Sequence, residues 1–133
     1  MINLINVFNL NKEEAEVLTR QKEIKNILGA INKLSPGYNI VTDGADGAYL
    51  SDGILNYHAK AIGTKPINTT GAGDAFGSAF CTGIFLKNDW DYGLRLGILN
   101  SDGVLKKMGA KNGLLKKVPV QKDLDKVKIG ILG

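Results

Sequence analysis

The sequence contains little of what several classes of protein need. Among its 133 residues there is one cysteine, Cys81, so no disulfide can form within the chain. The single histidine, His58, excludes a metal site built from several histidines of one chain, and we give it no role. No apolar run reaches the roughly 18 residues of a membrane-spanning helix, and the opening MINLINVF lacks the basic region and cleavage site of a signal peptide. These absences predict a cytoplasmic protein that has no membrane partner.

What is present indicates one ordinary globular domain over residues 1–133. Hydrophobic residues make up 44% of the chain and charged residues 23%, a balance that permits a packed core. Apolar neighbours such as Phe80 and Ile84 favour a packed rather than a reactive thiol at Cys81. The net charge is +4, and its main basic cluster, residues 106–117, has no interleaved aromatic residues. We therefore expect no nucleic-acid partner.

Hydrophobic periodicity and turn residues predict a layered α/β domain. Ile24, Ile27 and Ile31 recur at helical spacing, and Asn9 or Asn11 can cap an earlier helix whose first turn is acidic. In chain order, the expected elements are a strand at 2–8, a helix after Asn9 or Asn11, a helix at 22–34, short strands at 39–42 and 48–50, extended chain at 54–62, a helix that starts near Asp74, a helix at about 91–107, and a tail from Val118 with a short helix and extended residues.

The most informative segment is NTTGAGDAF, residues 68–76, in which two glycines precede a helix. Gly71 and Gly73 permit a backbone that points successive N–H groups into one concavity, where they attract an anion. Asp74, in the first helical turn, would stay ionised beside these donors and could accept a proton from an alcohol. The same residues also fit a simple turn before a helix start that Asp74 stabilises. A Walker loop is excluded because no lysine follows Gly73, and a Rossmann fingerprint because Phe76 stands where Gly or Ala is needed.

This segment resembles the signature of the ribokinase-like (PfkB) family of carbohydrate and nucleoside kinases. Further matches follow the family's order along most of the chain: residues 11–14 (NKEE) for its NxxE motif, residues 42–47 (TDGADG) for its ATP-contacting TxGxxG turn, and Asn100 with Gly109 and Ala110 for its adenine-side region. The resemblance implies a ribokinase-like layered α/β/α fold. Because every match belongs to the family's C-terminal half, we expect a truncated sheet and no substrate-binding or lid portion.

The resemblance also implies a role for each matched residue. Asp74 corresponds to the catalytic base, and the amides of Gly71, Ala72 and Gly73 correspond to the anion hole. The residues expected to bind the nucleotide are Thr42, Gly44, Gly47, Asn100 and Gly109. Asn11 and Glu14 would help to hold Mg²⁺ and phosphate through water, which suits an ion that keeps several of its waters. Considered without the resemblance, Asn11 and Glu14 fit a helix cap and a first-turn acid.

The function that the resemblance implies is that of a carbohydrate kinase, which uses ATP and Mg²⁺ to phosphorylate a hydroxyl of a sugar or nucleoside. Asn68 stands where the family usually has Asp; the missing charge leaves activation by a monovalent cation doubtful. Without an acceptor pocket, we expect the isolated chain to be inactive. The alternatives are a non-catalytic nucleotide-binding module and a subunit that depends on a partner. An exposed sheet edge could also lead to homo-oligomers.

Overall fold

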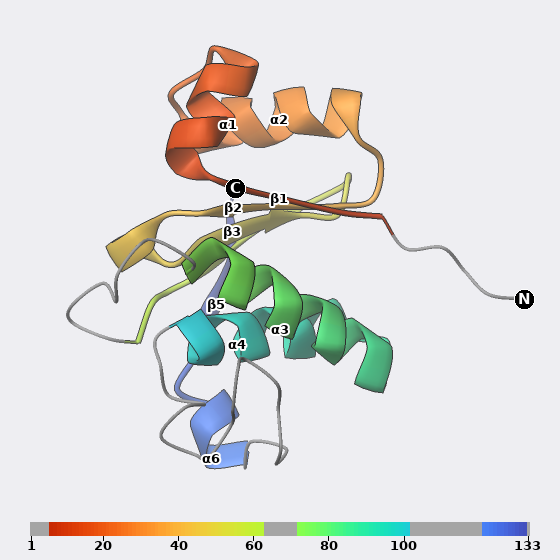
Figure 1. Ribbon diagram of the computed structural model, residues 1–133, viewed down its shortest axis with the longest axis vertical. Helices are drawn as coiled ribbons and strands as arrows, with labels where there is room; N and C mark the ends of the chain where they lie inside the picture. Colours follow the sequence, from red (N-terminus) through yellow and green to blue (C-terminus); the bar gives the residue numbers. More distant parts are fainter. Residues whose placement is uncertain (1–5, 63–71, 102–120, 133) are drawn as a thin grey trace, which may run out of the picture.

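A mixed five-stranded sheet forms the middle layer of the molecule (Figure 1). The computed structural model describes residues 6–62, 72–101 and 121–132, with the backbone alone for Ala45, residues 72–75 and Ser101. The strands follow one another across the sheet in chain order: β1 (Val7–Asn11), β2 (Tyr38–Thr42), β3 (Ala48–Ser51), β4 (Asn56–Ala59) and β5 (Ile129–Leu132). β1 and β2 are parallel, and each later pair is antiparallel. The carboxyl ends of β1 and β2 therefore meet at one end of the sheet.

Helices cover both faces of this sheet. The helices α1 (Lys12–Thr19) and α2 (Ile24–Leu34) lie on one face, and α3 (Ala72–Lys87) and α4 (Trp90–Ser101) lie on the other, as Figure 1 shows. A single helical turn, α6 (Gln121–Leu124), packs against α4 shortly before β5. Arg95 of α4 holds this region by donating to the carbonyl oxygens of Leu124 and Val127 at 2.8 and 2.7 Å. The predicted layered α/β/α fold is confirmed.

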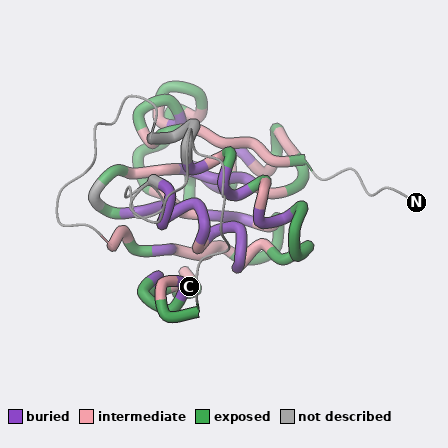
Figure 2. Tube along the Cα trace, turned by 60° about the horizontal axis from the view of Figure 1, so that its bottom comes forward, coloured by how far each residue is buried: buried purple, intermediate pink, exposed green. Residues whose placement is uncertain are grey.

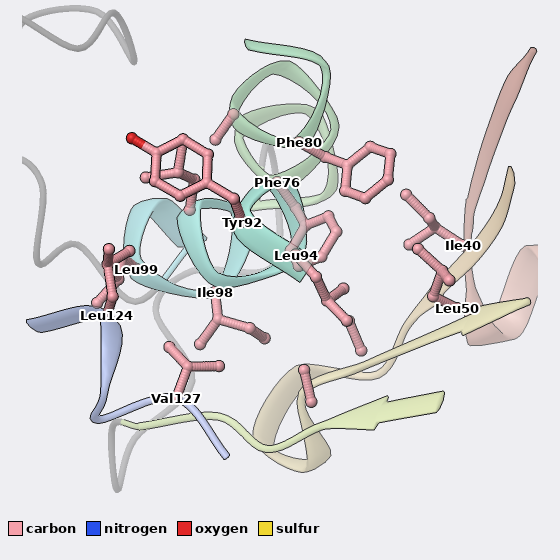
Figure 3. Packing of buried hydrophobic residues seen from close by; sticks show 14 of the residues in the cluster. Ile40, Leu50, Phe76, Phe80, Tyr92, Leu94, Ile98, Leu99, Leu124 and Val127 are labelled. Carbon is pink, nitrogen blue, oxygen red and sulfur yellow. The ribbon is translucent and has the colours of Figure 1, made fainter. Parts of the chain in front are cut away.

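Alternation along the strands divides the core into two clusters, one on each face. Ile40 of β2 belongs to the cluster beneath α3 and α4, where Phe80 points toward it (Figure 3). Val41, the next residue, packs with Ile27 and Ile31 of α2 on the opposite face. The helix expected at 22–34 is therefore confirmed as α2, which begins two residues later than expected, and Ile27 and Ile31 of its expected apolar face are buried. In Figure 2 the buried residues run through the middle of the molecule, with exposed residues outside them.

Glycines allow α3 and α4 to pack at short distance. A Cβ built on Gly83 would lie 2.5 Å from the Cα of Gly93, and one built on Gly97 would lie 2.7 Å from the ring of Phe76. These contacts show that the two helices are antiparallel, because a late residue of each helix meets an early residue of the other. The end of α4 therefore lies close to the start of α3.

The first strand is displaced from its expected position. The apolar run predicted a strand that ends at Phe8, but β1 continues to Asn11 because its residues pair with β2 from Val7 with Tyr38 to Asn11 with Thr42. Backbone hydrogen bonds, which do not depend on side-chain polarity, determine where this strand ends. The part of the prediction that covers residues 1–5 lies outside the described residues.

The expectation of a packed thiol is wrong, because Cys81 is exposed. Helix α3 buries Phe76, Phe80 and Ile84, which recur at a spacing of four residues. At 100° per residue, Cys81 is turned away from this buried face. Apolar neighbours in the sequence were therefore a poor guide, since the same surface also carries Phe85, which is 88% exposed.

Candidate functional site

The described parts of the segments predicted to bind nucleotide, phosphate and metal come together at one end of the sheet. Asn11, the last residue of β1, pairs with Thr42, the last residue of β2. Gly77, in the second turn of α3, lies against Asn9 of β1, whose Nδ2 would be 2.7 Å from a Cβ built on that glycine. In Figure 1 the starts of α1 and α3 lie at this same end of the sheet. We take this end as the candidate site.

The start of α3 supplies backbone donors to the candidate site. The helix begins at Ala72, so Ala72, Gly73 and Asp74 form its first turn. The first four N–H groups of a helix lack partners within it, and they carry the positive end of its dipole. Two of the three amides expected to form the anion hole, those of Ala72 and Gly73, thus lie where a backbone attracts negative charge. Gly71 lies outside the described residues, and so does the side chain of Asp74.

Asn11 and Glu14 form a reciprocal cap at the start of α1. The Oδ1 of Asn11 accepts from the backbone N–H of Glu14 at 2.8 Å, and the Oε1 of Glu14 accepts from the N–H of Asn11 at 3.1 Å. This is the capping box that stabilises many helix starts. The simpler interpretation of these residues is therefore observed, whereas their part in holding Mg²⁺ stays a prediction. A carboxylate has two oxygens, so a capping Glu14 retains acceptor capacity for a metal-bound water.

Three of the predicted nucleotide-binding residues lie at the end of β2 and just after it: Thr42 is the last residue of the strand, and Gly44 and Gly47 lie in the turn that follows. This turn contains η1 (Gly44–Asp46), one turn of 3₁₀ helix in which the N–H of Asp46 donates to the carbonyl of Asp43 at 2.8 Å. The N–H of Asp43 donates in turn to the carbonyl of Gly47 at 2.8 Å, which closes the loop. The structure thus forms a tight turn beside the start of α1, and nucleotide contact by these residues remains a prediction.

The predicted adenine-side residues are described only in part. Asn100 lies in the last turn of α4 and is 4% exposed. Because α4 is antiparallel to α3, with Gly97 against Phe76, Asn100 is also close to the start of α3. Gly109 lies outside the described residues. Its role, like that of Asn100, remains a prediction.

Charged groups surround the turn at the end of β2. The Nζ of Lys12 lies 3.6 Å from the Oδ2 of Asp43, an ion pair that joins the start of α1 to the turn. Burial raises the pKa of Tyr49 above its ordinary value, and the nearby carboxylates of Asp43 and Asp46 raise it further, while Lys12 opposes them. The phenol of Tyr49 is therefore neutral at physiological pH, and it does not add a negative charge to the site.

One residue beside this turn was missed by the sequence analysis. His58 of β4 was given no role, yet its Nε2 lies 2.6 Å from the carbonyl oxygen of Asp46 in η1. The two residues are twelve positions apart, and the contact depends on the register of the β3–β4 hairpin. The strand predictions at 48–50 and 54–62 contained the signal for this hairpin, but they did not fix which residues face each other.

Comparison with known proteins identifies the family. The model of the pfkB family carbohydrate kinases matches residues 1–117. This chain belongs to the pfkB family of carbohydrate kinases. The ribokinase of Lactococcus lactis is 30% identical to it over 132 residues, which cover 98% of this chain and 42% of that enzyme. Fructosamine kinase FrlD of Bacillus subtilis is 38% identical over 71 residues, which cover 50% of this chain and 25% of that enzyme.

Solved structures share the fold of this pfkB-family chain. Fructokinase from Vibrio cholerae, solved with fructose, ADP and calcium, is similar with a TM-score of 0.59 and 26% identity, over 90% of this chain and 39% of that one. Adenosine kinase from Sinorhizobium meliloti shares the fold with a TM-score of 0.66 at 20% identity, over 90% of this chain and 35% of that one. The chain therefore spans less than half the length of these relatives.

Two further observations concern the described parts of this pfkB-family chain. Among residues 6–62, 72–101 and 121–132, no helix has the length and apolar character needed to cross a membrane. In the same ranges, no three His, Cys, Asp or Glu side chains gather as metal ligands would. A site for Mg²⁺ does not require such a cluster, because this ion is commonly bound by one or two carboxylates, its own waters and substrate phosphates.

Proposed function

We propose that this chain forms the nucleotide-binding and phosphoryl-transfer part of a carbohydrate kinase. The reaction would move the γ-phosphoryl group of ATP to a hydroxyl of a sugar or nucleoside. The observation that carries the proposal is the start of α3 at Ala72, which leaves the amides of the first helical turn, Ala72 to Asp74, without helical partners at the sheet end where the 42–47 turn and the cap of α1 also lie. Membership of the pfkB family supports it.

In the proposed reaction, Asp74 takes the proton of the acceptor hydroxyl. The hydroxyl oxygen then forms a bond to the γ-phosphorus, the bond from that phosphorus to the bridging oxygen breaks, and ADP leaves. The amides of Gly71, Ala72 and Gly73 would stabilise the charge on the transferring group, because fixed donors need no rearrangement during the reaction. Asn11 and Glu14 would hold Mg²⁺ through water, and the ion would offset the charge of the phosphates.

We propose that, in the longer relatives, the acceptor binds mainly to the part of the enzyme that this chain does not cover. The chain covers 42% of the Lactococcus ribokinase. Without the acceptor held in place, the reacting groups lose a pre-organisation that is worth about 7–11 kcal/mol. We therefore expect the isolated chain to bind nucleotide and to phosphorylate sugars slowly or not at all.

Calorimetric titration of the full chain with a non-hydrolysable ATP analogue tests the proposal. Binding should be measurable and stronger with Mg²⁺. Ala72→Pro should weaken it by about tenfold to a hundredfold, because proline removes one donor to a charged group while remaining compatible with the first helical turn. Asp74→Asn should retain binding, since the carboxylate acts on the acceptor and not on the nucleotide.

The matched control is Gln121→Pro, which places proline at the first position of a different helix, α6. This variant should bind the analogue as the unaltered chain does. Absence of nucleotide binding by the unaltered chain, or equal losses in the two proline variants, would contradict the proposed function.

A further inference from the structure

The turn predicted to contact ATP is short and contains glycine. The 3₁₀ turn η1 contains three residues; its first residue, Gly44, and the residue that follows it, Gly47, have φ angles of +45° and +91°. Glycine loses more backbone freedom on ordering than other residues do. A binding loop of this kind needs support from neighbouring elements if it is to be ordered before its ligand arrives.

Strand β4 supplies that support at two points. A Cβ built on Gly47 would collide with the carbonyl oxygen of Ala59 and would lie 2.7 Å from the nitrogen of Ala61, so the turn rests directly on the end of the strand. At the second point, the Nε2 of His58 lies 2.6 Å from the carbonyl oxygen of Asp46. This second contact is made by a side chain, so it can be altered without changing the backbone.

The chemistry of the contact fixes the role of the ring. A carbonyl oxygen only accepts hydrogen bonds, so the Nε2 of His58 must carry the hydrogen and donate it. The ring is held in place by Tyr49, its cross-strand partner in the β3–β4 ladder. The two rings are stacked, with centroids 4.5 Å apart and planes inclined by 17°. His58 is therefore a donor that is oriented by its neighbour.

We propose that His58 is a positioning residue for nucleotide binding, which rests on the proposed function: by donating to the Asp46 carbonyl it holds η1 in the conformation that receives ATP. His58 does not touch the reacting atoms in this proposal. Its effect is to reduce the loss of conformational freedom when the turn closes on a ligand. The charged groups around the same turn are Asp43, Asp46 and Lys12.

Two substitutions separate the hydrogen bond from the ring stack. His58→Phe keeps an aromatic ring against Tyr49 and removes the donor. His58→Gln keeps a donor at a similar distance from the backbone and removes the ring. Both variants, in the full chain, are compared with the unaltered protein by amide hydrogen exchange without nucleotide and by calorimetric titration with a non-hydrolysable ATP analogue and Mg²⁺.

The phenylalanine variant should exchange the amides of Asp46 and Gly47 faster and bind the analogue about fivefold more weakly, as expected for one net hydrogen bond. The glutamine variant should restore most of both properties. Thermal unfolding of each variant shows whether the global fold is retained. If His58 had a purely structural role, its substitution would lower the unfolding temperature of the whole domain and would not affect the turn selectively.

Equal nucleotide affinity of the unaltered chain and His58→Phe, in a protein that does bind, would overturn this inference and leave the proposed function intact. Unchanged exchange at Asp46 and Gly47 would overturn it as well. If the unaltered chain binds no nucleotide, the proposed function fails and the inference fails with it, and that result is distinguished by the missing signal in the unaltered chain.

Discussion

Gly47 shows how single residues shape the candidate site. Its φ of +91° lies in the region that residues with a Cβ rarely adopt, and its Cα faces the Ala59 carbonyl with no room for a side chain. Gly53, in the turn between β3 and β4, has nearly the same φ, +93°, but a Cβ built there would meet nothing within 4 Å. A comparison of substitutions at the two glycines therefore separates the cost of backbone strain from the cost of a steric collision.

We predict that Gly47→Ala destabilises the chain by about 3 kcal/mol or more, the sum of backbone strain and overpacking. Gly53→Ala, the matched control, should cost about 1–2 kcal/mol because it carries the strain alone. Chemical denaturation of both variants measures the difference. Equal losses would mean that the close approach of the turn to β4 is not a rigid feature of the fold.

The sequence was informative about residues whose neighbours in the chain decide their structure. Asn11 and Glu14 are three positions apart, so a cap could be proposed from spacing alone, and the capping box is present. Position 74 was expected in the first turn of a helix, and α3 begins at Ala72. His58 could not be assigned in this way, because its partner Asp46 is brought to it by strand pairing and not by local sequence.

At the scale of elements, β1 and α1 join without a loop. Asn11 is the last residue of β1 and also the N-cap of α1, so one side chain sets the position of the helix start relative to the sheet. A cap of this kind contributes about 1 kcal/mol. Because the proposed metal role belongs to the same residue, capping and metal binding have to be separated by experiment.

We predict that Asn11→Ala lowers the free energy of unfolding by about 1 kcal/mol, and that Asn11→Ser, which can still cap, lowers it by less. If the amide also helps to hold Mg²⁺, both variants should lose part of the gain in nucleotide affinity that Mg²⁺ provides. Calorimetric titrations with and without Mg²⁺ provide the comparison. A serine variant with the full Mg²⁺ effect would show that Asn11 is a cap only.

Predictions for whole elements succeeded where apolar spacing decides the structure. The spacing of Ile24, Ile27 and Ile31 identified α2, in which Ile27 and Ile31 are buried and Ile24 is partly buried. The limits of β1 were missed because Asn9 and Asn11 are polar and are held in the strand by pairing with β2. The close packing of α3 on α4 through Gly83 and Gly93 could not be read from the sequence, because it depends on which faces of two separate helices meet.

At the scale of the whole molecule, the three layers place the candidate site at one end of the sheet. The carboxyl ends of the parallel strands β1 and β2 lie at that end, and so do the starts of α1 and α3 (Figure 1). Both outer strands, β1 and β5, are edges of the sheet described here. An edge strand offers unpaired backbone groups. The longer relatives contain residues outside the region that matches this chain, which is 42% of the Lactococcus ribokinase.

The most direct test of the proposed site is a titration of the isotopically labelled full chain with a non-hydrolysable ATP analogue and Mg²⁺, followed by the amide shifts of every residue. We predict that the largest changes fall on residues 71–74 and 42–47 and on Asn11, at the carboxyl ends of β1 and β2. Changes concentrated at the opposite end of the sheet, near residues 35–38 and 51–55, or no changes at all, would contradict a nucleotide site formed by the start of α3.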